Sequence, residues 1–181
     1  MTYTKQEKLN KVGACALASI REMVAALECD YDRMEELRDE RDTWIDAKWE
    51  DDENGTPPDG AAIWAAEFPG EAQEFAALEE AAGECKGDDD ARQRIEEDPL
   101  SIEYRTGWMT QRETVERDDW AEAKILLTTG GPAVQIIVEL NDGEPHRAYL
   151  QVQDWGTPWT DYYEQGIADT LMAYVGVFCW E

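Results

Sequence analysis

Residues 124–140, KILLTTGGPAVQIIVEL, decide the fold class of this chain. Aliphatic and β-branched residues fill Lys124 to Thr129 and again Val134 to Leu140, which predicts two strands. Between them, the glycines and proline of 130–132 are turn residues and predict a tight connection. The stretch therefore predicts an antiparallel hairpin within a sheet.

Two more strands are expected on either side of this hairpin. Residues 100–108 and 148–153 show the same alternation of apolar and polar side chains, and the turn residues of 141–145 join the last two strands. A helical period over 166–177 can cover one sheet face, and residues 178–180 can pack where the chain ends. We expect a four-stranded antiparallel meander with a C-terminal helix.

The N-terminal half is predicted to be helical. Apolar residues recur every three or four positions from Gln6 to Trp49, which indicates one long amphipathic helix or a helical hairpin. Its apolar seam would suit a homodimer or packing against 61–85. The Asp, Gly and Pro residues of 51–60 predict a loop or linker, and Pro69-Gly70 should split the helical pattern of 61–85.

A further short helix is expected from Asp88, as its N-cap, through Glu97, with Pro99 ending it. The fold class is thus α+β. We expect three regions: a long helical region over 1–50, an acidic linker with short helices over 51–98, and the sheet with its C-terminal helix over 99–181.

Charge is the unusual property of the composition. The 181 residues include 42 acidic and 16 basic side chains, a formal net charge of −26, and residues 51–100 alone carry −13. Repulsion from phosphates predicts that the chain does not bind nucleic acid directly. The acidity itself has three readings: mimicry of a nucleic acid, solubility, or adaptation to high salt, which the scarcity of lysine (6 residues) would also fit.

The sequence lacks the features of membrane proteins, secreted proteins and zinc proteins. Its apolar runs are shorter than the roughly 20 residues of a membrane span, and its polar N-terminus does not resemble a signal peptide, so we expect a cytoplasmic protein. Four scattered cysteines with no CxxC pair predict reduced thiols. A single histidine, His146, argues against zinc.

Six carboxylates form a candidate binding stripe. On a continuous helix they would share one face, because they are spaced by three and four residues: Glu28, Asp32, Glu35, Asp39, Asp42 and Asp46. At a rise of about 1.5 Å per residue they would span roughly 27 Å, like a sparse phosphate backbone. The alternative is a solvated helix face whose charge Arg33, Arg38 and Arg41 partly relieve.

The sequence contains few residues of the types that form a catalytic site. With two serines and one histidine, a serine triad is disfavoured, and the acidic neighbours of Cys29 should raise the pKa of its thiol. Cys15 and Cys179 resemble core positions. The acidic clusters do not match a calcium loop, and Asp88, Asp89 and Asp90 are explained by a helix start, so we expect no catalytic residue, no metal and no cofactor.

The stretch from Asp154 to Tyr163 is dense in aromatic residues. It has two readings, a recognition loop for a partner or a corner of the core. We favour the core, because a small sheet needs bulky side chains to fill it.

The C-terminal half also carries a resemblance. Four motifs resemble a family of small acidic proteins encoded by bacteriophages and prophages: Glu97-Asp98-Pro99-Leu100-Ser101, RTGW at 105–108, LLTTGGPAV at 126–134 and QDWGTPWT at 153–160. The likeness covers about residues 88–181, and the long N-terminal region departs from the shorter relatives. The family implies no catalytic residues.

By analogy of charge and phage origin, and not by homology, we expect a DNA mimic that blocks a basic host defence complex in the bacterial cytoplasm, with a CRISPR effector favoured over a restriction enzyme. The expected contacts are the stripe first and then Asp88, Asp89 and Asp90. One alternative is a structural or regulatory phage protein that binds through its Trp/Tyr-rich stretch, and another is a carboxylate enzyme that needs a divalent metal.

Overall fold

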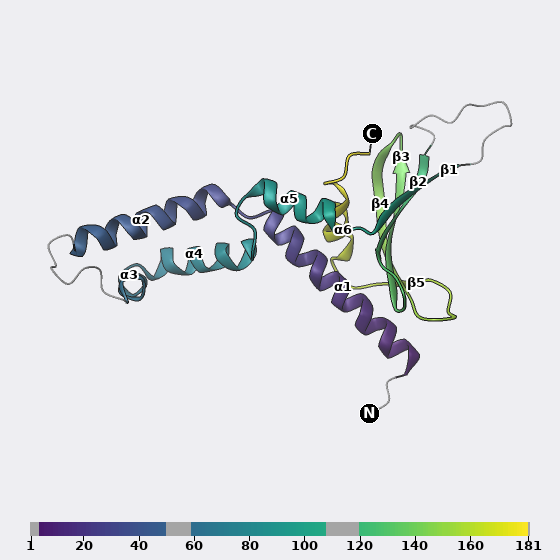
Figure 1. Ribbon diagram of the computed structural model, residues 1–181, viewed down its shortest axis with the longest axis horizontal. Helices are drawn as coiled ribbons and strands as arrows, with labels where there is room; N and C mark the ends of the chain where they lie inside the picture. The colour runs from purple at the N-terminus through teal and green to yellow at the C-terminus, as the bar shows by residue number, and fades with distance from the viewer. Residues whose placement is uncertain (1–3, 50–58, 108–119, 181) are drawn as a thin grey trace. The chain divides into compact units, whose positions relative to one another are not determined.

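The computed structural model of the chain describes residues 4–49, 59–107 and 120–180. Their helices are α1 Lys5–Leu27, α2 Tyr31–Trp49, α3 Gly60–Glu67, α4 Pro69–Ala82, α5 Asp88–Glu97 and α6 Ile167–Val175. Their strands are β1 Ser101–Thr106, β2 Trp120–Thr128, β3 Ala133–Asn141, β4 Glu144–Gln153 and β5 Thr160–Tyr162. The predicted α+β class is confirmed (Figure 1).

The strands form one antiparallel sheet in the order β1-β2-β3-β4-β5. The four predicted strands are present as a meander, and β5 adds a fifth that pairs with β4 through Leu150 and Tyr162. Between β3 and β4 the turn residues Asp142 and Gly143 both have positive φ, the backbone that a two-residue hairpin connection prefers. The predicted connection at 141–145 is therefore tighter than expected.

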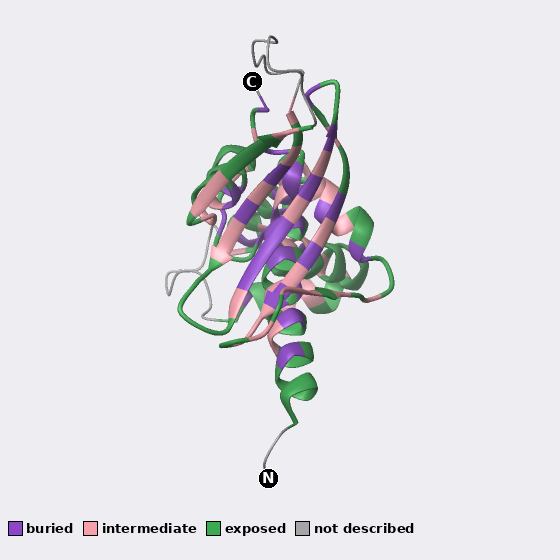
Figure 2. Cartoon of the chain, turned by 90° about the vertical axis from the view of Figure 1, so that its right-hand side faces the viewer, coloured by how far each residue is buried: buried purple, intermediate pink, exposed green. Residues whose placement is uncertain are grey.

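One sheet face forms the core of this part of the chain. Ile125, Ile136 and Leu150 lie side by side on three neighbouring strands, and all three are fully buried. Figure 2 shows buried residues alternating with half-buried ones along the strands. The helix α6, which packs on β4, adds the fully buried Leu171 and Val175, so the predicted C-terminal helix does cover a sheet face.

The first turns of α1 pack on the edge of the same sheet. Gly13 lies so close to the ring of Tyr162 that a Cβ at this position would overlap it, so only glycine allows the contact. Further along the helix, Arg21 forms an ion pair of 2.6 Å with Glu164. A small residue in a helix thus sets how near α1 approaches β5.

A partly buried hydrogen bond joins α6 to Asp98, the residue that follows α5. The Tyr174 hydroxyl donates to the Asp98 carboxylate at 2.6 Å, and Tyr174 is fully buried. Burial, and then the hydrogen bond to Asp98, raise the pKa of Tyr174 well above its ordinary value. The folded state therefore holds this proton more tightly than the unfolded state does.

Removing this hydroxyl should weaken the sheet unit. For Tyr174→Phe we expect a loss of about 1.5–3 kcal/mol in the free energy of unfolding near neutral pH, because Asp98 loses a charge-assisted bond. Unfolded tyrosine loses its proton near pH 10, so wild-type stability should fall as pH rises above about 10, and less steeply in the variant. Urea unfolding at pH 8 and 11 measures both effects. The exposed Tyr163→Phe is the control; equal slopes for all three proteins would contradict the prediction.

The helical region of residues 5–49 consists of two helices, although one continuous helix was among the expectations. The helix α1 ends at Leu27, and α2 begins at Tyr31 with Asp30 as its cap, because the Asp30 carboxylate accepts the backbone N–H of Arg33 at 2.9 Å. The long-helix interpretation is therefore wrong. The predicted split at Pro69 is confirmed, since α3 ends at Glu67 and Pro69 is the first residue of α4.

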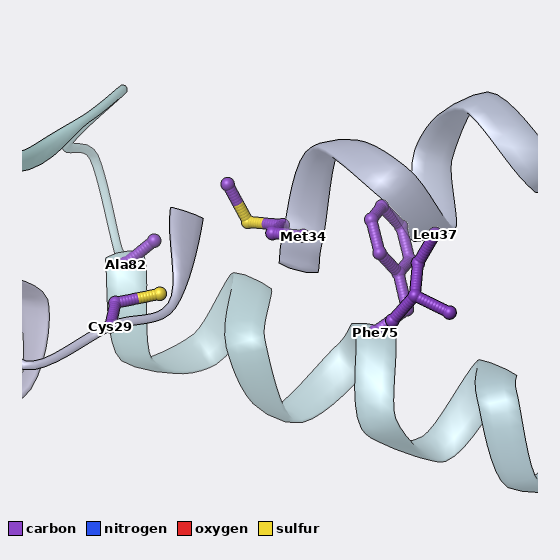
Figure 3. Packing of buried hydrophobic residues seen from close by; sticks show 5 residues of the cluster. All are labelled: Cys29, Met34, Leu37, Phe75 and Ala82. Atoms are coloured by element: carbon purple, nitrogen blue, oxygen red, sulfur yellow. The ribbon is translucent and has the colours of Figure 1, made fainter. Parts of the chain in front are cut away.

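The helices α2 and α4 share a small core of their own. Met34 and Leu37 of α2 pack with Phe75 and Ala82 of α4 and with Cys29, which precedes α2 (Figure 3). The apolar side of α2 is thus covered by the helices of 61–85, one of the two occupants expected for it.

The compact units do not follow the predicted region boundaries. One unit contains residues 1–24 and 92–181, including the sheet, and the other contains residues 25–91. Most of the predicted linker, residues 51–58, and Trp108 of the first predicted strand lie outside the described residues. Within the described ranges, no helix combines the length and apolar character that crossing a bilayer requires.

Candidate partner-binding surface

Five of the six predicted stripe residues lie on α2. Asp32, Glu35, Asp39, Asp42 and Asp46 are all exposed, and their spacing puts them on the face opposite Met34, Leu37 and Ile45; we call them the acidic ridge. Glu28 precedes the helix, so its place in the stripe was wrong. The ridge spans about 21 Å at 1.5 Å per residue.

Three cations of α2 make contacts with α3 or α4. Arg33 makes two hydrogen bonds to Glu74 of α4, at 3.0 and 3.1 Å, and Lys48 pairs with Glu67 of α3 at 3.0 Å. Arg41 lies over the ring of Phe75, 5.1 Å from its centroid. The hydrogen bonds from Arg33 lower the pKa of Glu74, so this pair remains ionised and holds α2 against α4.

The acidic ridge is left largely unneutralised as a result. Among the described residues, Arg41 pairs with Asp42 at 2.8 Å, whereas no ion pair or hydrogen bond reaches the other four ridge carboxylates. Glu35/Asp39 and Asp42/Asp46 are like-charge pairs four residues apart, and each costs a few tenths of a kcal/mol. The alternative reading, in which the arginines relieve the stripe, holds for Asp42 alone.

Charge is concentrated in the unit that carries the ridge. Residues 25–91 contain 23 acidic and 5 basic side chains, a formal net charge of −18, whereas the sheet unit contains 19 and 11, a net of −8. Four of those five cations belong to α2, and only Arg41 among them pairs with a ridge carboxylate. The unit therefore presents a strong negative potential on a helix face about four turns long.

The second predicted cluster lies in the first turn of α5. Asp88, Asp89 and Asp90 are exposed, and Asp88 is the first residue of the helix instead of its cap. The Asp90 carboxylate accepts the backbone N–H of Lys86 at 3.0 Å, and three acids also suit the positive end of a helix dipole. In the part of the chain that the structure describes, no group of three His, Cys, Asp or Glu side chains is arranged to hold a metal ion.

The core interpretation that we favoured for the aromatic stretch is wrong for Trp155 and Tyr163, whereas Trp159 and Tyr162 are half-buried. Trp155 is 77% exposed and Tyr163 is 85% exposed, while Tyr162 faces the core from β5. Trp155 contacts the turn between β2 and β3, where Gly131 has a φ of 93° and a Cβ would overlap the indole. Two large apolar side chains thus remain open to a partner.

The cysteines also differ from expectation. Cys29 is buried, and its burial, followed by the charges of Asp30 and Asp88, raises the pKa of its thiol in the predicted direction. Cys15 and Cys179 are exposed, so their assignment to the core was wrong. Cys15 lies on α1, beside an apolar row formed by Leu9, Val12 and Ala16.

Comparison with protein-family models, with curated proteins and with solved structures finds no match for this chain. Function must therefore be inferred from the chain's own geometry and charge.

Proposed function

We propose that this protein is a phage-encoded acidic mimic of a nucleic-acid backbone, which occludes the basic nucleic-acid-binding surface of a host defence complex. The favoured target is a CRISPR effector, with a restriction enzyme as the other. The observation that carries the proposal is the acidic ridge: among the described residues, only Asp42 of its five carboxylates has an ion pair. If this helix face served only solubility, the helix would gain stability from pairing the Arg and Lys side chains of α2 with the ridge carboxylates.

The geometry suits a groove built for DNA. The ridge places one carboxylate about every 5 Å of helix axis, against one phosphate per about 3.4 Å on each DNA strand. A helix has about half the width of B-DNA and fits a channel that admits a duplex. The exposed Asp88, Asp89 and Asp90 of the same unit are the secondary contacts.

Affinity in this proposal comes mainly from charge. A basic groove that binds the ridge releases its own bound anions and gains contacts that fall off with ionic strength. The screening length shrinks from about 10 Å at 0.1 M salt to about 3 Å at 1 M. Binding should therefore weaken steeply with salt, as DNA binding does.

A salt-stepped pull-down from bacterial lysate tests this. The tagged full-length protein should retain one dominant nucleic-acid-binding complex at low salt and release it at high salt. The purified complex should then lose its binding to target DNA when the protein is added. Raising the salt should release the protein and restore DNA binding, up to the salt concentration at which the complex no longer binds DNA by itself. A partner that survives the high-salt wash, or a complex whose DNA binding is unaffected, would contradict mimicry.

A second candidate function rests on the exposed aromatic side chains. A structural or regulatory phage protein would bind its partner through Trp155 and Tyr163, with charge serving solubility. Apolar docking resists salt, so the same pull-down separates the two functions. A Trp155→Ala/Tyr163→Ala variant that loses the salt-resistant partner would support this second function.

A further inference from the structure

A groove of about 680 Å³ lies in the sheet unit, away from the acidic ridge in sequence. One wall is the N-terminal half of α1, and the other consists of Thr128, Pro132 and Val134 around the β2–β3 turn, together with Asp154 after β4. Its size falls within the range of about 300–1,000 Å³ that is typical of small-molecule sites.

The wall that α1 supplies has two chemical rows. Leu9, Val12 and Ala16 form an apolar row that continues across to Pro132 and Val134. Lys8, Lys11 and Cys15 form the second row, one position earlier at each step, and all three are exposed. The groove therefore combines an apolar floor with an edge that carries two ammonium groups.

The lysine edge of the groove is locally positive, whereas the chain as a whole is strongly negative. Residues 1–24 contain four basic and two acidic side chains, in a chain whose net charge is −26. Three of the six lysines fall within residues 5–11. A site for an anion is consistent with this local charge, whereas the acidic ridge would repel one.

We propose that this groove binds an amphiphilic carboxylate, a hydrocarbon chain with a single anionic head. The chain would lie along Leu9, Val12 and Val134, and the head would lie at Lys8 and Lys11. On the opposite wall, the Asp154 carboxylate accepts the backbone N–H of Trp155 at 2.9 Å. Its negative charge repels the ligand's head and so sets the orientation of the chain.

The length of the hydrocarbon should control affinity. Each methylene that leaves water strengthens binding by roughly 4-fold, until the apolar floor is filled. Dodecanoate is therefore a suitable probe, and hexanoate should bind at least about 100-fold more weakly. Dodecyltrimethylammonium has the same chain with a positive head, and it tests the role of the lysines.

Chemical modification of Cys15 measures whether the groove is occupied. Of the four cysteines, Cys15 and Cys179 are exposed, while Cys29 and Cys85 are buried. In the full-length Cys179→Ser protein, the rate of maleimide modification therefore follows Cys15. With dodecanoate below its micelle concentration, we expect this rate to fall at least 10-fold and saturably, while circular dichroism stays unchanged. Dodecyltrimethylammonium should not protect.

Three variants in the Cys179→Ser protein test the roles of the lysine and of the apolar floor. Lys8→Glu should raise the dodecanoate concentration needed for half-protection by about 10-fold or more. The matched Lys86→Glu, an equal charge change on an exposed lysine of the other unit, should leave it unchanged. Val12→Trp fills the floor and should abolish protection; if it does not fold, Lys8→Glu still decides.

Three results would overturn the proposal. The first is an unchanged Cys15 rate at every dodecanoate concentration. The second is equal protection by the cationic amphiphile, which would remove the role of the lysines. The third is a rate that depends on protein concentration without added ligand, because a second copy of the chain would then occupy the groove.

Discussion

Reversing the charge of Asp32, Asp39 and Asp46 together is expected to weaken inhibition of the target by on the order of 100-fold. Each lysine replaces an attraction with a repulsion, worth about 1 kcal/mol at an exposed position, and about 3 kcal/mol for three is close to two factors of ten. The fold should persist, because all three carboxylates are exposed and none has an ion pair or hydrogen bond among the described residues.

The control for this variant must match its change in net charge. Glu22, Glu96 and Asp169 are exposed acids outside the 25–91 unit, and their replacement by lysine changes the charge by the same amount. That control should inhibit nearly as well as the wild type, whereas the ridge variant should also lose most of its salt dependence. Equal inhibition by both folded variants would remove the acidic ridge as the contact surface.

The second large effect concerns stability. Leu37→Ala should unfold α2, α3 and α4 while the sheet stays folded. Leu37 is fully buried against Phe75 and Met34, and losing such a side chain costs about 2–5 kcal/mol. A unit of 67 residues has a total stability of about 3–10 kcal/mol at ordinary values per residue, so a loss of this size is comparable to the whole.

Hydrogen exchange resolves this outcome by segment. Amides of α2 and α4 should lose protection in Leu37→Ala, and amides of β3 and β4 should keep theirs. Glu35→Ala, on the exposed side of the same helix, should change stability by no more than about 0.5 kcal/mol. Equal loss of protection in α2 and β3 would mean that the two units unfold as one.

Separate unfolding bears on the proposed mimicry as well. A net charge of −18 within residues 25–91 repels itself, and a basic partner would relieve that repulsion on binding. The unit should therefore gain stability from its target, while the sheet unit should not. The Leu37→Ala variant would then recover part of its α2 protection when the target is added.

Local sequence signals determined a large part of the architecture. Alternation over a few residues predicted the strands around the Gly130-Gly131-Pro132 turn, and Pro69 marked the boundary between α3 and α4. These signals succeed because a turn residue or a proline restricts its own backbone whatever lies elsewhere in the chain. The acidic spacing along α2 was equally readable, since helical periodicity alone puts those carboxylates on one face.

Tertiary contacts decided the rest. The sequence alone could not show that Arg33 pairs with Glu74, 41 residues away, and not with a ridge carboxylate. The same is true of β5, which forms by pairing with β4, and of Trp155, whose exposure follows from its position beside the β2–β3 turn. The groove also joins α1 to residues more than 110 positions later. Composition and periodicity thus specified the charge and the elements, whereas contacts between distant residues decided which charges and which aromatic rings remain free to act.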